Sequence, residues 1–453
     1  MNEYRLNVAS LKEGRISPLQ IRVIVLSVLL GLVDGYDTLA VAYAAPIMRT
    51  ALDLSSTVLG WVFSSALIGG IAGMFLGGPI ADRVGRRPTL IAQVLVFGVF
   101  TLLSAYARSA EELLLYRFFA GLGLGLALTV TFTIVSEYAP SRFKVTAIAL
   151  ITIGYSAGAG LGGLVGAWLI KSYSWHAIFY VGGAAAFCLA IAFLIALPES
   201  LEFLVNSSKS DDRVNELARK MRPEIYAQGI PVLFAEKDDV QSIGLGELFR
   251  PGRLSVTLLL WTVFFMNLIE LYGVQQWLPT LIHQSGVDVS SAVSAGAVLQ
   301  IGAILGGIIF SHIIDKWKQP FKLFPYLFLA GGLAFSSLSY AGGSTLWTMS
   351  SVVLLGAFVM GTQIALNGVA TMVYPPSVRA TGISWAVAVG RIGGASGPVL
   401  SGFLLQQGFS ASQILLMGAV PATIAFAAAL CLSSNEAFSQ PRLREALNHE
   451  AAT

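Results

Sequence analysis

The chain has 453 residues, of which 55% are hydrophobic and only 12% are charged, with 47 glycines and a mean hydropathy of +0.73. Soluble globular proteins carry about 25% charged residues. This composition therefore excludes a soluble enzyme, a nucleic-acid binder and a disordered scaffold, and indicates an integral membrane protein. The formal net charge of +3 is too small to indicate a partner, so the positions of the charges matter more than their sum.

Apolar segments that are long enough to cross a bilayer recur along the chain, since about 20 helical residues span the hydrocarbon core. Twelve such segments cover residues 22–48, 56–81, 88–108, 112–137, 143–170, 177–197, 254–282, 289–314, 321–341, 345–373, 379–406 and 410–433. The short alternating segments typical of a transmembrane β-barrel are absent from the sequence. We therefore predict an all-α membrane protein with twelve transmembrane helices.

The basic residues indicate the orientation of these helices. They concentrate in the two tails, in the loops after even-numbered segments and in the polar segment 199–253, whereas the loops after odd-numbered segments contain only Arg49, Arg108 and Lys171. Because Lys and Arg accumulate on the cytoplasmic side, both termini are expected to be cytoplasmic, which requires an even number of spans. The polar N-terminal segment lacks a signal-peptide pattern, because the apolar run that follows is too long.

The long polar segment divides the chain into two sets of six helices. The predicted domains are a cytoplasmic tail (1–21), an N-terminal bundle (22–198), a cytoplasmic linker (199–253), a C-terminal bundle (254–434) and a second cytoplasmic tail (435–453). Residues 211–221 in the linker are expected to form a short surface helix.

Similar residues recur in the same order in the two halves, as expected for a duplicated six-helix unit. The matching pairs are Asp34 with Asn267, Asp37 with Glu270, and Asp82 with Asp315. A Tyr-Ala-Pro-Ser run at 138–141 also recurs as Tyr-Pro-Pro-Ser at 374–377.

The loop after the second segment contains Asp82, Arg83, Gly85, Arg86 and Arg87 within the run Gly-Pro-Ile-Ala-Asp-Arg-Val-Gly-Arg-Arg-Pro. This pattern resembles the signature of the major facilitator superfamily. Its basic residues can pair with carboxylates of neighbouring helices in one conformation and release them in another. The alternative is that the arginines only anchor the loop on the cytoplasmic side.

Arg117 lies inside the fourth segment, before Gly121 and Gly125. Glycines four residues apart allow a second helix to approach closely. A buried Arg117 needs an anionic or carbonyl partner, and the alternative is that its side chain extends to the membrane interface.

Asp34 and Asp37 lie inside the first segment. Each aspartate at the centre of a helix costs about 2.5–3.5 kcal/mol to insert, so such residues usually mark a transport pathway. Three residues apart, they share one helix face. Arg391 lies twelve residues after Arg379, as Asp34 lies twelve residues after Arg22, so we expect the two charges at similar depth. A purely structural ion pair is the alternative to a site for a proton and an anion.

The run Asp-Gly-Tyr-Asp-Thr at 34–38 resembles the aromatic acid:proton symporter family of the superfamily, as do Trp-Leu-Pro-Thr at 277–280 and Gly-Arg-Ile-Gly-Gly at 390–394. Pro-Glu-Ser at 198–200 resembles the superfamily's ending of the sixth helix. The resemblance implies two six-helix bundles around a central cavity, and proton-coupled import of an aromatic carboxylate such as hydroxybenzoate or benzoate by alternating access. It also implies that certain charged positions are required: Asp34, Asp37, Asp82, Glu137, Arg379 and Arg391.

The predicted roles follow from this resemblance and from the charges. Asp34 and Asp37 would bind the proton, and Arg391 would hold the substrate carboxylate. The other candidate substrate-binding residues are Tyr36, Tyr155, Trp277, Trp385 and Glu270, and the candidate gating residues are Asp82, Arg83, Gly85, Arg86, Arg87, Glu137, Arg379 and Asp315. Glu270 departs from the family pattern, which leaves substrate preference and proton stoichiometry open.

Other functions remain open at this level. Within transporters, these are a symporter of another organic anion, such as muconate or a sugar acid, and an exporter. A membrane receptor or enzyme is a further alternative, although Ser156 and Ser396 lie in glycine-rich helical packing sequences and lack the partners of a hydrolase. We expect an inner-membrane monomer that binds protons and a small aromatic carboxylate but no nucleic acid. Its cysteines and histidines lack metal-ligand spacing, so we expect no metal or cofactor.

Overall fold

The computed structural model describes residues 16–206, 211–221, 245–250, 253–316, 320–342, 344–370, 373–374 and 376–434. These residues form helices and loops without a β-strand. They group into two compact units. The N-terminal unit comprises the described residues of Met1–Gln241 and Val289–Ala297, and the C-terminal unit comprises those of Ser242–Asp288 and Val298–Thr453.

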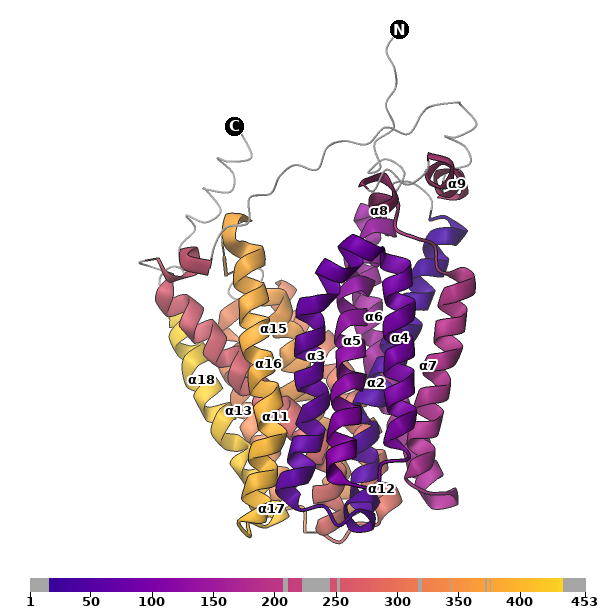
Figure 1. The fold of residues 1–453 in the computed structure, drawn as a ribbon. Coiled ribbons are helices and arrows are strands. Elements are labelled where there is room, and N and C mark those ends of the chain that lie inside the picture. The colour runs from indigo at the N-terminus through magenta and orange to yellow at the C-terminus, as the bar shows by residue number, and fades with distance from the viewer. Residues whose placement is uncertain are drawn as a thin grey trace. The chain divides into compact units, whose positions relative to one another are not determined.

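The N-terminal unit contains six long helices and a peripheral pair of short ones (Figure 1). They are α2 (Pro18–Ala51), α3 (Ser56–Val84), α4 (Arg86–Ser104), α5 (Ala110–Tyr138), α6 (Lys144–Ser172), α7 (His176–Ala196), α8 (Leu201–Asn206) and α9 (Asp211–Met221), with a 3₁₀ turn, η1 (Ser141–Phe143), before α6. Within this unit α2 packs against α6, α3 against α5, and α4 against both α5 and α7.

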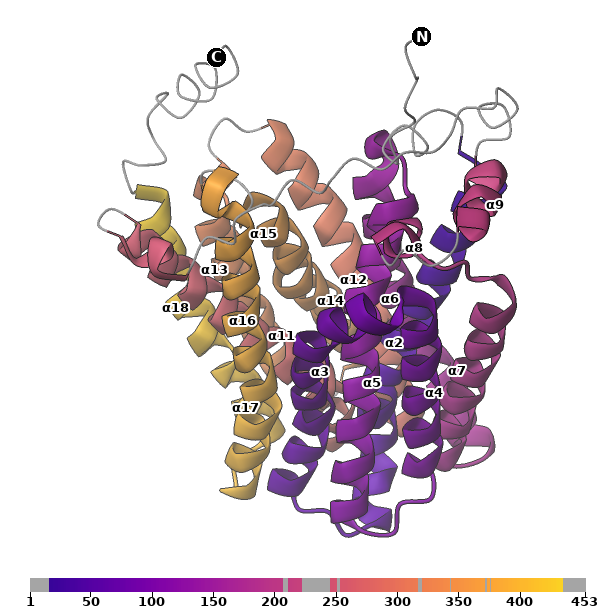
Figure 2. The same cartoon turned by 45° about the horizontal axis from the view of Figure 1, so that its top comes forward.

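The C-terminal unit is also helical, but more of its spanning segments are divided into shorter helical pieces. It contains η2 (Leu245–Phe249), α11 (Leu254–Gln284), α12 (Val289–Lys316) from Val298 onward, η3 (Pro320–Lys322), α13 (Phe324–Ser339), α14 (Thr345–Leu355), the π-helix η4 (Gly356–Gly361), α15 (Thr362–Ala370), α16 (Pro376–Gln406), α17 (Ala411–Met417) and α18 (Ala419–Ser434). Here α11 packs against α16 and α18, and α13 packs against α18 (Figure 2).

Every predicted apolar segment coincides with a helix or with consecutive helical pieces. Ten described helical stretches are long and apolar enough to cross a membrane, with α14–η4–α15 and α17–α18 each counted as one stretch, and α13 is a shorter apolar helix. The prediction for the ninth segment was too long, because a 3₁₀ turn at Pro320–Lys322 precedes α13 and the helix ends at Ser339. The tenth segment contains the π-helix, and a turn at Gly418 interrupts the twelfth.

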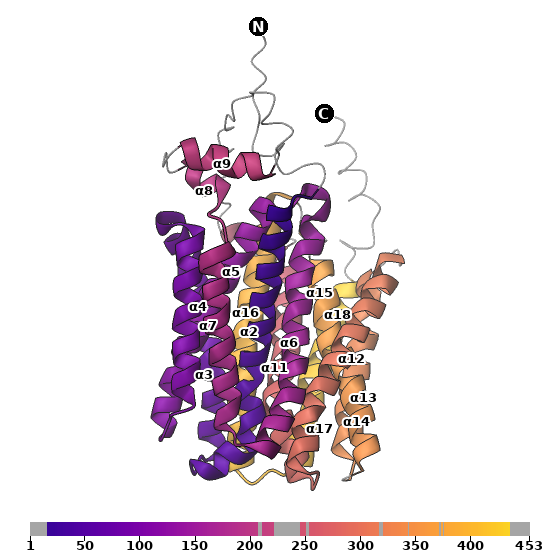
Figure 3. The same cartoon turned by 90° about the vertical axis from the view of Figure 1, so that its right-hand side faces the viewer.

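The predicted surface helix at 211–221 is confirmed as α9, which lies across the end of the N-terminal unit near α8 and the start of α2 (Figure 3). Val214, Ala218 and Met221 are buried, and Val214 and Met221 join a core cluster that includes Leu19 and Leu204. An amphipathic helix of this kind is held by its apolar face rather than by its intrinsic propensity.

Glycines set the distance between the paired helices. A Cβ atom added at Gly158 of α6 would overlap the carbonyl oxygen of Leu32 in α2, and one added at Gly121 of α5 would overlap the carbonyl oxygen of Ala66 in α3. The predicted close approach at Gly121 and Gly125 is therefore confirmed. Without these side chains, the backbones pack directly on each other.

We expect Gly158→Val to lower the stability of the N-terminal unit by about 3 kcal/mol or more, because overpacking against backbone leaves no side chain that can move aside. Thermal unfolding in detergent micelles would measure the change. Gly368→Ala in α15 is the control, because no atom outside its own helix backbone lies within 4 Å of its added Cβ. Equal loss of stability in the two variants would contradict this account of the α2–α6 contact.

Candidate functional site

A buried ion pair lies at the centre of the N-terminal unit. Arg117 Nη2 of α5 lies 2.5 Å from Asp37 Oδ2 of α2, and Nη1 donates to Oδ1 at 3.2 Å. Thr101 of α4 donates its hydroxyl to the same Oδ1 at 2.9 Å. The side chains of Asp37 and Arg117 are 0% and 1% exposed. Arg117 is thus paired inside the unit, and three helices converge on one carboxylate.

Asp34 lies one helical turn before Asp37 and is also buried. It accepts a hydrogen bond from the hydroxyl of Thr38 at 3.2 Å. Tyrosine hydroxyls hold α2 in place near these acids, since Tyr36 donates to the Ile178 carbonyl of α7 at 3.0 Å and Tyr43 donates to the Ala159 carbonyl of α6 at 2.6 Å. The two acids therefore lie on a helix that is tied to its neighbours by directional bonds.

A second charged network lies where α3 ends and α4 begins. Arg86 Nη2 lies 2.8 Å from Asp82 Oδ1, and its Nε lies 3.4 Å from Glu137 Oε1 of α5. Asp82 is 67% exposed, whereas Glu137 is 4% exposed, so the guanidinium connects a surface acid to a buried one. Arg83 is exposed. The structure thus brings together three of the residues predicted to form the gate.

Glu199 completes this network, although it was not among the predicted site residues. Its Oε1 accepts backbone hydrogen bonds from Arg86 at 2.8 Å and Arg87 at 3.1 Å, at the first turn of α4. A carboxylate at a helix N-terminus satisfies free N–H groups and interacts favourably with the helix dipole. The sequence signal was Pro-Glu-Ser at 198–200. Because Glu199 lies more than 100 residues from α4 along the chain, the sequence does not reveal that it caps this helix.

Gly85 allows this contact. Its φ is +113°, a conformation that L side chains rarely adopt, and an added Cβ would lie 2.6 Å from Glu199 Oε2. Arg87 also donates through Nη2 to the Leu194 carbonyl at 2.6 Å. The glycine of the signature is therefore required both by backbone geometry and by the space that Glu199 occupies.

Arg391 is the central charged candidate of the C-terminal unit. It lies on α16 and is half-buried, and its Nε is buried without a hydrogen-bond partner. No acid pairs with it among the described residues. A guanidinium with free donors inside an apolar bundle is suited to bind a carboxylate in two-pronged fashion.

The predicted aromatic residues differ in their surroundings. Trp277 of α11 is fully buried, and its indole N–H donates to the Pro398 carbonyl of α16 at 2.9 Å. Trp385 is 40% exposed and stacks on Trp261 with ring centroids 6.2 Å apart. Tyr155 is half-buried on α6.

One face of α11 carries buried polar side chains that the sequence interpretation left largely unused. Asn267 donates to Gln363 Oε1 of α15 at 2.8 Å, and Gln363 donates in turn to Asn367 at 2.9 Å. Glu270 is 4% exposed and its Oε1 has no hydrogen-bond partner, and both polar atoms of Gln275 also lack one. Polar residues inside an apolar run were a usable signal, since they usually mark a pathway or a site.

Some predicted residues are not brought together within a unit. Asp34 and Asp37 belong to the N-terminal unit and Arg391 to the C-terminal unit, so the predicted relation between these charges stays a prediction. Arg379 is half-buried and donates through Nε to the Tyr374 carbonyl at 3.3 Å. The side chain of Asp315 lies outside the described part of the structure. Within the described residues, no group of three or more His, Cys, Asp or Glu side chains is arranged to hold a metal ion.

Curated relatives resemble the chain over nearly its whole length. The 4-hydroxybenzoate transporter PcaK of Pseudomonas aeruginosa is 35% identical over 94% of this chain and 95% of its own length. The gallate transporter of Pseudomonas putida is 31% identical over 91% of each chain. The benzoate transport protein of Acinetobacter baylyi is 30% identical over 87% of this chain and 85% of its own.

A solved structure shares the fold. The partially occluded inward-open xylose transporter XylE from E. coli superimposes with a TM-score of 0.71 at 18% identity, covering 91% of this chain and 97% of that one. At this identity the likeness supports the fold alone.

The family model of the Major Facilitator Superfamily matches residues 27–398. The predicted all-helical fold and the resemblance to transporters of aromatic acids are thus confirmed, and so is the prediction that the chain is not an enzyme, because these relatives are transporters. The chain is a multi-pass membrane protein that belongs to the Major Facilitator Superfamily.

Proposed function

We propose that this protein imports an aromatic carboxylate, such as hydroxybenzoate or benzoate, together with protons. The observation that carries the proposal is the half-buried Arg391 guanidinium with its unbonded Nε. The relatives named for 4-hydroxybenzoate, gallate and benzoate support an aromatic acid as its ligand. In this proposal the protein is a monomer of the inner membrane with both termini in the cytoplasm.

Arg391 binds the substrate carboxylate by charge-assisted hydrogen bonds. Tyr36, Tyr155, Trp277 and Trp385 are the candidates for contact with the aromatic ring. Tyr36 and Trp277 already donate their polar hydrogens to backbone carbonyls and are buried in this conformation, so a contact with the substrate would use the ring rather than hydrogen bonds. These aromatic residues select the flat apolar part of the substrate, and the arginine selects its charge.

Asp34 and Asp37 are the proposed proton-binding residues of the N-terminal unit. Their surroundings differ, since Asp37 is paired with Arg117 whereas a neutral hydroxyl donates to Asp34. The Arg117 partner comes from α5, so Asp37 links the proposed proton site to the packing of α2 on α5.

The gate is proposed to consist of Asp82, Arg83, Gly85, Arg86, Arg87, Glu137, Arg379 and Asp315. Arg86 holds Asp82 and Glu137 together in this conformation. In alternating access, one bundle rocks against the other around a fixed site. We propose that these ion pairs form in one state and separate in the other.

In proteoliposomes with an imposed pH gradient, acid outside, the protein is expected to accumulate labelled 4-hydroxybenzoate, and a protonophore should abolish the accumulation. Asp34→Asn should remove the accumulation, because the neutral amide cannot carry a proton. Competition by a panel of acids tests the alternatives: stronger competition by muconate or a sugar acid than by benzoate would contradict an aromatic substrate. Accumulation only under the opposite gradient would indicate an exporter.

Asp53→Asn is the matched control for this experiment. Asp53 is exposed and has a φ of +48°, a conformation that Asn tolerates well. It makes the same chemical change outside the bundle and should leave the accumulation unchanged.

A further inference from the structure

Glu270 occupies the position in α11 that matches Asp37 in α2, but it lacks the partner that Asp37 has. Asp37 is paired with Arg117 of α5, the fourth long helix of the N-terminal unit. The fourth spanning segment of the C-terminal unit, α14 with η4 and α15, contains no Lys, Arg or His. Glu270 therefore matches Asp37 in position, but the described part of the C-terminal unit has no cation that matches Arg117.

No other described group compensates the charge of Glu270. The residue is 4% exposed, its Oε1 has no hydrogen-bond partner, and no ion pair joins it to a described cation. Burying an ionised carboxylate without a partner is very costly, whereas a neutral carboxyl group is far easier to bury. In the conformation seen here, the neutral acid is the form that this environment favours.

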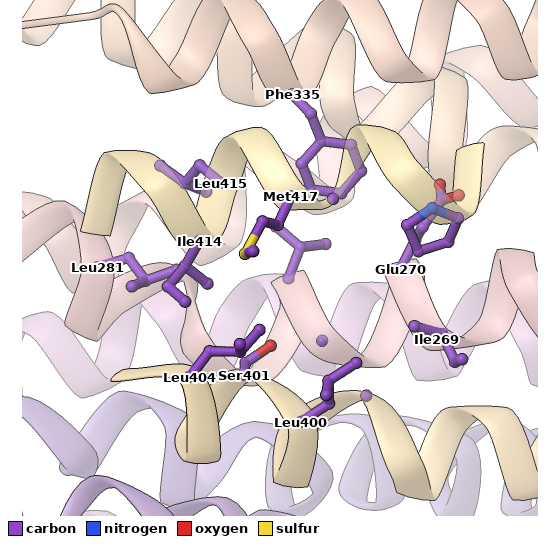
Figure 4. Close-up of a pocket in the computed structure, with 15 residues that line it drawn as sticks. Ile269, Glu270, Leu281, Phe335, Leu400, Ser401, Leu404, Ile414, Leu415 and Met417 are labelled. Atoms are coloured by element: carbon purple, nitrogen blue, oxygen red, sulfur yellow. The ribbon is translucent and has the colours of Figure 1, made fainter. Parts of the chain in front are cut away.

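A small, partly open pocket adjoins Glu270 (Figure 4), and its lining includes the exposed residues Leu400 and Met417; it is called the cavity below. Its volume is about 70 Å³, and it is lined by residues of α11, α13, α16, α17 and α18. Glu270 lies at one end, and Leu281 and Ile414 lie at the other, with the Ser401 side chain between them. A water molecule needs only about 10–15 Å³ of such space, whereas a cavity of about 150 Å³ is known to hold benzene. The pocket therefore has room for a few waters.

The walls of the cavity offer polar partners for water. Ser401 contributes a hydroxyl group. Together with the Glu270 carboxyl group, this hydroxyl gives the pocket two polar groups, the smallest number of polar contacts that an ordered water requires.

Glu270 is the only titratable residue among the fifteen that line the cavity. The helices that form its walls carry other titratable or charged residues, all of them outside the lining: Tyr272, His283, Tyr326, Arg379, Arg391 and Cys431. Protonation in the cavity is therefore a property of Glu270 itself.

We propose that Glu270 is a second proton-binding site, in the C-terminal unit, which exchanges its proton with water in the adjoining cavity and carries that proton during transport. The inference rests on the proposed function, because it adds one proton to the transport cycle. Its helix, α11, packs against α16, which carries Arg391. A proton bound at Glu270 removes a negative charge from the C-terminal unit, so the proton and the substrate anion would favour each other's binding.

The first test compares the wild type with Glu270→Gln in proteoliposomes. One coupled proton contributes a factor of about ten to the accumulation ratio for each unit of pH difference. Glu270→Gln should therefore lower steady-state accumulation about tenfold at a gradient of one pH unit, while exchange of labelled for unlabelled substrate continues. Glu111→Gln, at an exposed position in the first turn of α5, is the matched control and should change neither value. An unchanged accumulation ratio in Glu270→Gln would overturn the proposal.

The second test reads the proton directly. Infrared spectra of the wild type should contain a protonated-carboxyl band that disappears in Glu270→Gln and remains in Glu111→Gln. Ser401→Leu, which fills the cavity with an apolar side chain, should keep the band but slow its shift in heavy water.

An identical band in wild type and Glu270→Gln overturns the proton site, even if transport is proton-coupled. If Glu270→Gln does not fold, an unslowed shift in Ser401→Leu overturns the role of the cavity water. A wild type that takes up no aromatic acid would contradict the proposed function alone, because the band reports Glu270 without transport.

Discussion

Arg117→Leu is expected to destabilise the N-terminal unit by about 3–5 kcal/mol. The substitution removes the only guanidinium from a carboxylate that is 0% exposed, and leaves Thr101 as its remaining side-chain donor in the bonds described here. The loss comes mainly from an uncompensated buried charge, rather than from the attraction of the pair itself. Unfolding in detergent, followed by temperature or denaturant, would measure it.

A double-mutant cycle separates the cost of the uncompensated buried charge from the loss of the attraction between Asp37 and Arg117. In Asp37→Asn with Arg117→Leu, the buried charge is absent and the Asn oxygen still accepts from Thr101, so at least half of the lost stability should return. The control is Lys220→Met, which breaks an ion pair with Glu216 whose side chains are 57% and 62% exposed. That variant should lose less than about 1 kcal/mol. A double mutant no more stable than Arg117→Leu would show that the size of Arg117 matters more than its charge.

Arg391→Gln is expected to weaken binding of the aromatic acid by about 30- to 5,000-fold, the effect of removing one partner of a desolvated charge pair at about 2–5 kcal/mol. Because the neutral amide keeps some hydrogen-bonding capacity, the protein should still fold. Arg391→Lys should give an intermediate loss, since it keeps the charge but not the two-pronged geometry.

Equilibrium binding of labelled 4-hydroxybenzoate to purified protein would measure these losses without requiring transport. Lys322→Gln removes one positive charge from an exposed position of the C-terminal unit outside the long helices and is the matched control. Wild-type affinity in Arg391→Gln would exclude this arginine as the carboxylate site and favour another anion-binding group. Equal losses in Arg391→Gln and Lys322→Gln would indicate a general effect of charge.

Most of the fold could be predicted because its determinants are local in the chain. Each spanning helix is an apolar run of sufficient length, and burial of its backbone requires internal hydrogen bonds. Interruptions were harder to place, as at Gly418, where a turn separates two short helices within one apolar run. An interrupted helix and a continuous helix bury similar side chains, so the composition of the apolar run does not distinguish them.

The candidate acids were also visible in the sequence, because a carboxylate inside an apolar run is costly to insert into the membrane whether or not it has a partner. Asp34, Asp37 and Glu270 look alike by this criterion, yet their surroundings differ. Tertiary packing brings Arg117 and Thr101 to Asp37, and leaves Glu270 beside a small cavity with no cation. These partners come from other helices, 64 and 80 residues away along the chain for Thr101 and Arg117.

The sequence by itself determined the membrane class, the helical segments, the superfamily signature and the presence of costly charges, since each depends on residues close together in the chain. Only the tertiary structure decided which charges are paired, that Glu199 caps α4, and which carboxyl group adjoins a cavity. The physical reason is that hydrophobic length and helix propensity act over a few turns, whereas the state of a buried charge is set by the groups that packing brings within a few ångströms of it.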